Sequence, residues 1–162
     1  MPTFPELEHK ITTLAQLLPI VTKLKAQGKI IVTNNGSYDI LHLGHLLGLF
    51  EAKHQGDVLI VGVNSDHSIR NYKGPTRPIN PEYMRVRMLA ALMCVDYAFL
   101  FDDTVPISWL AQLQPHIHTN GAEYGKDCIE REVVESHGGT IHLLSMLEGY
   151  KTTNIINKIK GL

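Results

Sequence analysis

The stretch of sequence that decides the fold is residues 29–63, which read KIIVTNNGSYDILHLGHLLGLFEAKHQGDVLIVGV. Residues 29–33 and 57–63 are short, continuous apolar runs of the kind found in strands that are buried on both faces of a sheet. Residues 43–54 have the apolar spacing of a helix, which Gly56 closes. A strand, a helix and a second strand in this order predict a βαβ unit with a right-handed crossover.

The rest of the chain continues this alternation. Residues 71–81 contain three prolines and a glycine and are predicted to form a loop. Further strands are expected at residues 96–101, 116–120 and 140–144, and further helices at residues 81–92, around Trp109, and at 130–137 and 152–159. The sequence therefore predicts an α/β fold, a Rossmann-like, doubly wound parallel sheet of about five strands with helices on both faces.

We expect a single domain over residues 29–162, preceded by a helical leader over residues 1–28. In that leader Pro19 is predicted to lie in the first turn of a helix that ends before Gly28. A chain of 162 residues with 44% hydrophobic and 19% charged residues is long and apolar enough to form one folded core.

The composition also limits which binding partners and which cellular compartment are expected for the protein. Fifteen Lys and Arg residues against sixteen Asp and Glu give a net charge of -1, which does not favour nucleic acid or an anionic membrane as partner. The longest apolar runs are far shorter than the roughly 20 residues of a membrane-spanning helix. With two cysteines and no signal-peptide pattern at the N-terminus, we expect the protein to be cytoplasmic.

The loop after the first strand is the predicted site, because ligands of doubly wound sheets bind beyond the carboxyl ends of the strands. His42 and His45 stand three residues apart at the start of the following helix, with Gly44 between them. Both imidazoles can point into one crevice, together with the free amides and the positive dipole end of that helix. Gly36 permits close approach of the backbone to a ligand. This arrangement suits a polyphosphate.

Two other interpretations of the histidines stay open at this point. A single loop histidine is usually only solvated or hydrogen-bonded, and histidine is also a common zinc ligand. His116 and His118 alternate along another predicted strand, but no third ligand stands at a recognisable spacing and the H-E-x-x-H pattern is absent. The G-x-G-x-x-G fingerprint of dinucleotide-binding proteins is also absent after the first strand.

The segment from Asp39 to His45 resembles the H-x-G-H signature of the cytidylyltransferase-like nucleotidyltransferases. One branch, the D-glycero-β-D-manno-heptose 1-phosphate adenylyltransferases of ADP-heptose synthesis, is similar over nearly the whole fold, from Lys29 to the C-terminus. The motifs that carry this resemblance are Val63-Asn64-Ser65-Asp66, Lys73-Gly74, Arg77-Pro78-Ile79-Asn80-Pro81, Arg85, Ala90-Ala91-Leu92, Val95-Asp96 and Thr152-Thr153-Asn154-Ile155-Ile156. It implies transfer of AMP from ATP to a phosphorylated sugar, with release of pyrophosphate by in-line attack.

The resemblance also implies roles for particular residues. The catalytic residues are expected to be His42, His45 and Lys53. The nucleotide-binding residues are expected to be Asn35, Gly36, Ser37, Tyr38, Asp39, His42, Gly44, His45, Asn120, Gly121, Thr152 and Thr153. The substrate-binding residues are expected to be Asn64, Asp66, Lys73, Arg77, Arg85 and Lys151. No residue is expected to bind metal in a preformed protein site, and Mg²⁺ is expected to enter with ATP.

Several of these residues also have simpler structural interpretations. Lys53 could be a solvated surface lysine, and Asp39 could cap the helix or orient a histidine. Asn64 and Asp66 could be turn formers at a strand end. Thr152 and Thr153 could serve only as helix caps.

Two departures from the branch bear on the acceptor. Where the branch usually has Lys-Gly-Gly-Asp-Tyr, this chain has Asn120-Gly121-Ala122-Glu123-Tyr124. The cation of the first position is therefore missing, and Lys151 is a candidate to replace it. The chain has no room for the sugar kinase of bifunctional members, so a separate upstream kinase is expected; a homodimer is a possible assembly. The alternatives are a cytidylyltransferase that uses glycerol 3-phosphate, and a non-catalytic nucleotide-binding module.

Overall fold

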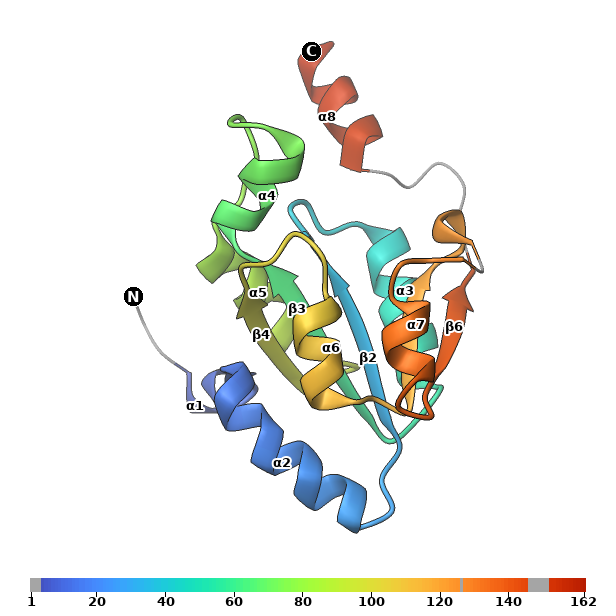
Figure 1. The fold of residues 1–162 in the computed structure, drawn as a ribbon. Coiled ribbons are helices and arrows are strands. Elements are labelled where there is room, and N and C mark those ends of the chain that lie inside the picture. The colour runs from blue at the N-terminus through green and yellow to red at the C-terminus, as the bar shows by residue number, and fades with distance from the viewer. Residues whose placement is uncertain (1–3, 126, 146–151) are drawn as a thin grey trace.

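The computed structural model describes residues 4–125, 127–145 and 152–162. It has a six-stranded sheet at its centre, in the order β1-β4-β3-β2-β5-β6, and every neighbouring pair is parallel (Figure 1). The strands are β1 (Ile11–Thr12), β2 (Ile31–Gly36), β3 (Val58–Asn64), β4 (Tyr97–Phe101), β5 (Ile117–Gly121) and β6 (Thr140–Leu144). The predicted doubly wound α/β fold is confirmed.

Helices cover both faces of the sheet (Figure 1). They are α1 (Pro5–Glu8), α2 (Leu14–Ala26), α3 (Leu43–Lys53), α4 (Asp66–Lys73), α5 (Glu82–Ala90), α6 (Ile107–Leu113), α7 (Arg131–Glu135) and α8 (Thr152–Lys160), with a short 3₁₀ turn η1 (Ala122–Tyr124). On one face α3 and α5 bury Leu49 and Leu89 against β2 and β3. On the other face α2, α6 and α7 bury Leu17, Trp109 and Val134 against the same strands. Strand β3 is buried along its whole length because both faces are covered.

The sheet has one strand more than the sequence predicted. In β1, Ile11 pairs with Ala98 and Thr12 pairs with Phe99 of β4. A strand of two residues is too short to leave a periodic pattern, so only its long-range pairing defines it.

One helix begins earlier in the chain than predicted, and another was not predicted. A capping box at Thr13 starts α2 at Leu14, so Pro19 lies inside the helix and not in its first turn. The predicted loop at residues 71–81 begins only at Gly74, because α4 extends to Lys73. Ser65 caps α4 by accepting the amide of Ser68 at 3.0 Å. This helix was not predicted because its sequence, DHSIRNYK, has almost no apolar spacing.

The order of the strands locates the site. From β2 the chain passes to β3 and β4 on one side, and it later returns to β5 and β6 on the other side. The order therefore reverses between β2 and β5, the place at which doubly wound sheets open a crevice. Helices α4 and α8 lie beyond the carboxyl ends of the strands (Figure 1). Among the described residues, no helix is long and apolar enough to cross a membrane.

Candidate active site

A cavity of about 680 Å³ opens at the carboxyl ends of the strands, within the size range of small-molecule sites. Most of the predicted site residues line it, namely Asn35, Gly36, Ser37, Tyr38, His42, Gly44, His45, Asn64, Lys73, Asn120, Gly121, Thr152 and Thr153. These residues come from β2, α3, β3, α4, β5 and α8, together with the loop that joins β2 to α3. The fold thus gathers segments that are far apart in the sequence into one pocket.

The two histidines of the loop form a stacked pair. Their ring centroids lie 3.7 Å apart with 20° between the ring planes. His42 is not on the helix face, as the spacing suggested, but is the N-cap of α3, with Nδ1 accepting the backbone amide of His45 at 3.3 Å. Because Nδ1 of His42 is an acceptor in this bond, the neutral ring carries its proton on Nε2. His42 is thereby both the helix cap and a potential donor to a ligand.

Burial keeps this pair uncharged. It lowers the pKa of His45 to about 4, with smaller contributions from His42 and Lys73, and it also lowers the pKa of His42. Near neutral pH both rings are therefore neutral and offer directed N–H donors rather than full positive charges. The Nδ1 atom of His45 is buried and has no hydrogen-bond partner within the described part of the chain.

Tyr38 packs against His45, the second histidine of the pair. Its ring lies 5.2 Å from that of His45, and its hydroxyl donates to Oδ1 of Asn34. Asn34 in turn donates to the backbone oxygen and the hydroxyl of Thr119, both at 2.9 Å, and so links β2 to β5. Tyr38 has a positive φ of 47°, and a Cβ at Gly36 would lie 3.2 Å from the Tyr38 ring. Gly36 therefore leaves room for the tyrosine that packs against His45.

The pocket has a cationic flank beyond β3. Lys73 at the end of α4 is the only lysine or arginine among the described lining residues. Its Nζ donates to Oγ of Ser37 at 2.9 Å. Burial lowers the pKa of Lys73, and the neighbouring Arg77 lowers it further. Asn64 at the end of β3 also lines this flank, but its amide already donates to Ser68 at 3.0 Å.

The opposite flank, beyond β5, contains a carboxylate. Asn120 donates through Nδ2 to Oε2 of Glu130 at 3.0 Å. Glu130 is only 6% exposed and lines the pocket, although the sequence indicated nothing about it beyond its place at the start of a helix. Further lining residues that were not predicted include Tyr72, Thr104, Val105, Pro106 and Tyr124. Thr104 to Pro106 follow β4, so the rule that ligands bind beyond strand ends would have indicated them.

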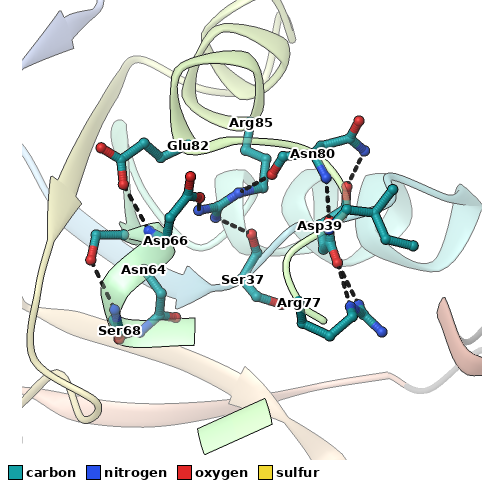
Figure 2. A network of polar contacts seen from close by, with 11 residues as sticks. Ser37, Asp39, Asn64, Asp66, Ser68, Arg77, Asn80, Glu82 and Arg85 are labelled. Atoms are coloured by element: carbon teal, nitrogen blue, oxygen red, sulfur yellow. Dashed lines mark hydrogen bonds and ion pairs between the residues drawn. The ribbon is translucent and has the colours of Figure 1, made fainter. Parts of the chain in front are cut away.

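Four predicted residues form a structural network and do not line the pocket (Figure 2). Arg85 has no exposed surface, and it donates to the backbone oxygens of Ser37 and Asn80 and, at 2.9 Å, to the carboxylate of Asp66. The expected substrate contacts of Arg85 and Asp66 are therefore not supported. Their charges satisfy each other, and the guanidinium fastens the Ser37 loop to α5.

Asp39 and Arg77 form the second half of this network (Figure 2). Asp39 is 1% exposed, pairs with Arg77 at 2.5 Å, and accepts the backbone amides of Ile79 and Asn80 at 2.8 Å. All of these partners belong to the segment between α4 and α5. Asp39 and Arg77 thus hold that segment against the loop, and neither of them lines the pocket.

Lys53 also lies away from the pocket. It is the last residue of α3, at the end opposite the stacked histidines, and its Nζ contacts Oδ2 of Asp96 at 2.5 Å and the backbone oxygen of Asp57 at 2.6 Å. The expected catalytic role is not supported, because the length of α3 separates Lys53 from the site. Lys151 lies outside the described residues.

The alternative zinc site gains no support from the geometry. His116 accepts the backbone amide of Ile31 at 2.9 Å, and His118 is fully buried with Nδ1 2.8 Å from the hydroxyl of Thr33. The described residues contain no group of three or more His, Cys, Asp or Glu side chains that could hold a metal ion.

The fold and the pocket define a class of protein: a doubly wound α/β protein with a helix N-terminus at its switch point, an arrangement that suits anionic ligands. The family described as Cytidylyltransferase-like matches residues 34–158, and the chain belongs to this family. The Bifunctional protein HldE of Geotalea uraniireducens is 43% identical over 157 residues, which are 96% of this chain and 32% of that protein. The corresponding protein of Campylobacter fetus is also 43% identical, over 95% of this chain and 32% of that protein.

This chain thus spans about a third of the length of these relatives. Among solved structures, the lipopolysaccharide core biosynthesis protein from Thermoplasma volcanium has a TM-score of 0.63 and 33% identity. That similarity covers 75% of this chain and 100% of the other. The pantoate-beta-alanine ligase from Francisella tularensis has a TM-score of 0.62 at 18% identity, over 94% of this chain and 78% of the other, and is similar in fold alone.

Proposed function

We propose that this protein transfers AMP from ATP to D-glycero-β-D-manno-heptose 1-phosphate, which gives ADP-heptose and pyrophosphate. The observation that carries the proposal is the stacked pair of neutral histidines at the N-terminus of α3, inside a pocket that Thr152 and Thr153 also line. Family membership and the similarity to HldE proteins and to a lipopolysaccharide core biosynthesis protein support it. The motifs that resemble the heptose 1-phosphate adenylyltransferases, quoted in the sequence analysis, favour this acceptor.

The reaction needs little proton transfer. An oxygen of the acceptor phosphate attacks the α-phosphorus of ATP, a new P–O bond forms, and the bond to the β-phosphate breaks, so that pyrophosphate leaves with the electron pair. Positioning and stabilisation of charge therefore dominate catalysis. His45 and Nε2–H of His42 donate to the triphosphate, where neutral N–H groups gain strength as charge gathers on the phosphoryl oxygens.

Two other elements complete the arrangement. Thr152 and Thr153 open α8, a helix of nine residues, and offer hydroxyls and free amides to the terminal phosphates. Lys73, at the end of α4, holds the phosphate of the acceptor. Lys73 is close enough to His45 to lower its pKa, so an acceptor phosphate at Lys73 lies near the stacked histidines. Holding both anions in one pocket brings the attacking oxygen toward the α-phosphorus.

The residues present fit Mg²⁺ that arrives with the nucleotide. Glu130 is the only carboxylate among the described lining residues, so most of the metal ligands have to come from ATP. Mg²⁺ bound to the triphosphate would offset its charge.

We also propose a cytoplasmic location, with which the two free, buried cysteines are compatible because that compartment is reducing. A separate sugar kinase would supply the acceptor. The protein would be able to assemble as a homodimer.

The test is a matrix of two nucleotides, ATP and CTP, against heptose 1-phosphate and glycerol 3-phosphate, scored by pyrophosphate release. We expect release only with ATP and heptose 1-phosphate. Turnover with CTP and glycerol 3-phosphate instead would replace the proposal by the cytidylyltransferase alternative. Nucleotide binding without release for any acceptor would favour a non-catalytic module.

A further inference from the structure

Glu130 is a buried carboxylate in the wall of a pocket that is otherwise suited to phosphate. It is 6% exposed, and a neutral amide rather than a cation orients it, because Nδ2 of Asn120 donates to Oε2 at 3.0 Å. Asn120 is itself fixed, since its Oδ1 accepts the amide of Gly121 at 3.1 Å. The carboxylate therefore has a defined direction without being neutralised.

The charges of the pocket are separated across β2. Lys73 comes from the segment after β3, on one side of β2, whereas Glu130 comes from the segment after β5, on the other side. No ion pair among the described residues includes Glu130. A buried carboxylate without a cation disfavours an anion beside it and favours groups that donate hydrogen bonds. The phosphates of a ligand are therefore excluded from the Glu130 flank.

We infer that Glu130, oriented by Asn120, accepts hydrogen bonds from the ribose hydroxyls of the nucleotide. This inference rests on the proposed function only in that the ligand is a nucleoside triphosphate. With its phosphates at the histidines, such a ligand can present only its neutral part to Glu130. The ribose is joined directly to the α-phosphate, and its two neighbouring hydroxyls are the donors nearest to it. Carboxylates bind ribose hydroxyls in this way in other doubly wound folds.

The inference assigns Glu130 a role in specificity. It sets the direction of the nucleotide, with the ribose toward β5 and the acceptor toward Lys73 and β3. It also predicts that the site distinguishes ribonucleotides from deoxyribonucleotides, because a deoxy sugar would leave a buried carboxylate with one donor fewer.

The test is calorimetric binding of ATP, 2′-deoxy-ATP, 3′-deoxy-ATP, purine riboside triphosphate and inorganic tripolyphosphate, without acceptor, to the parent protein and to Glu130→Gln. Glu132→Gln is the matched control, since Glu132 is exposed on α7, the short helix of which Glu130 is the N-cap. We expect the parent to bind ATP about tenfold more tightly than at least one of the deoxy analogues. Glu130→Gln should lose that preference and bind tripolyphosphate as tightly as the parent or more tightly, while Glu132→Gln behaves as the parent.

A second variant distinguishes loss of the ribose contact from loss of folding. Asn120→Lys places a cation beside the carboxylate, and we expect it to raise the affinity for tripolyphosphate and to reduce the preference for ATP over its deoxy analogues. An unchanged preference in both variants, even with a lower melting temperature, would overturn the inference in favour of a structural role for Glu130.

Two further outcomes would also overturn it. Equal weakening of ATP and tripolyphosphate by Glu130→Gln would assign the carboxylate to a metal ion on the phosphates. A loss of discrimination only against purine riboside triphosphate, which lacks the amino group of adenine, would assign it to the base. Because no acceptor is present, failure of the heptose assignment leaves the binding result intact. Failure of the parent to bind any nucleotide would overturn both proposals.

Discussion

His45 donates its backbone amide to Nδ1 of His42 at 3.3 Å, and the two imidazoles stack with centroids 3.7 Å apart. One hydrogen bond thus begins the helix and at the same time fixes the tautomer of His42. The stacking holds the second ring, and burial keeps both neutral. The donors are therefore oriented before a nucleotide binds, which is the condition for strong stabilisation of a transition state.

Replacement of His45 by alanine should reduce kcat by about 10² to 10³, as loss of one preorganised donor does in other enzymes. The dissociation constant of ATP should change less, because the donor strengthens as charge develops. Pyrophosphate release and calorimetry measure the two quantities. His54→Ala, at the far, exposed end of the same helix, is the control. A His45→Ala variant that turns over within a few-fold of the parent would remove His45 from the mechanism.

Lys73→Met should raise the KM for the acceptor by roughly tenfold to a hundredfold, the cost of one charge-assisted hydrogen bond, with a smaller effect on kcat. Lys53→Met is the matched comparison. It should lower the melting temperature, because Lys53 bridges Asp96 and the backbone of Asp57, and leave KM unchanged. Steady-state kinetics and thermal unfolding separate the two cases. The reverse result would restore the catalytic role first expected of Lys53.

Arg85→Met should lower the free energy of unfolding by about 3 to 5 kcal/mol, because it leaves the Asp66 carboxylate and two backbone oxygens without their buried donor. Arg87→Met, which removes a partly exposed ion pair with Glu8, should cost about 1 kcal/mol or less. Urea unfolding measures both. Full stability of Arg85→Met, combined with a large rise in KM, would show that Arg85 binds substrate after all.

Acid should destabilise the protein through its buried histidines. Burial lowers the pKa of His118 to about 3, whereas an unfolded histidine has a pKa near 6.5. Between these values the unfolded state binds one proton more, so stability is highest above pH 6.5 and falls as the pH decreases toward 3. The slope is about 1.4 kcal/mol per pH unit for this one group. His45 contributes in the same direction down to about pH 4.

Urea unfolding of the parent and of His118→Gln between pH 4.5 and pH 7 isolates the part of this pH dependence that belongs to His118. The variant should be less stable at neutral pH and should lose stability less steeply with acid. Parallel curves would show that His118 does not bind an additional proton on unfolding.

Metal dependence gives a further prediction. A chelator should abolish pyrophosphate release, and added Mg²⁺ should restore it, because the pocket offers few carboxylates and the nucleotide has to supply the ligands. Metal analysis of the purified protein should find no stoichiometric zinc. Tightly bound zinc whose removal inactivates the protein would revive the histidine-ligand interpretation.

The sequence predicted those parts of the fold that depend on the pattern of neighbouring residues. Residues 29–63 have the alternating periods of a buried strand and a helix, so the βαβ unit and the position of the loop between them follow from them alone. The sequence also placed His42 and His45 together at one helix start, but the structure was needed to show that His42 is the N-cap and that the two rings stack. The general place of the site follows from the rule for parallel sheets.

Tertiary structure decided everything that depends on long-range pairing. Arg85 and Lys73 are both cations near predicted site segments, and only the fold shows that Arg85 is enclosed by Asp66 and two carbonyls while Lys73 faces the pocket. Asn120 at the end of β5 donates to Glu130, ten residues further along the chain, and only the fold shows that contact. A charged side chain has the same local pattern whether it binds a ligand or a neighbour, since its partner is chosen by packing and not by its place in the sequence.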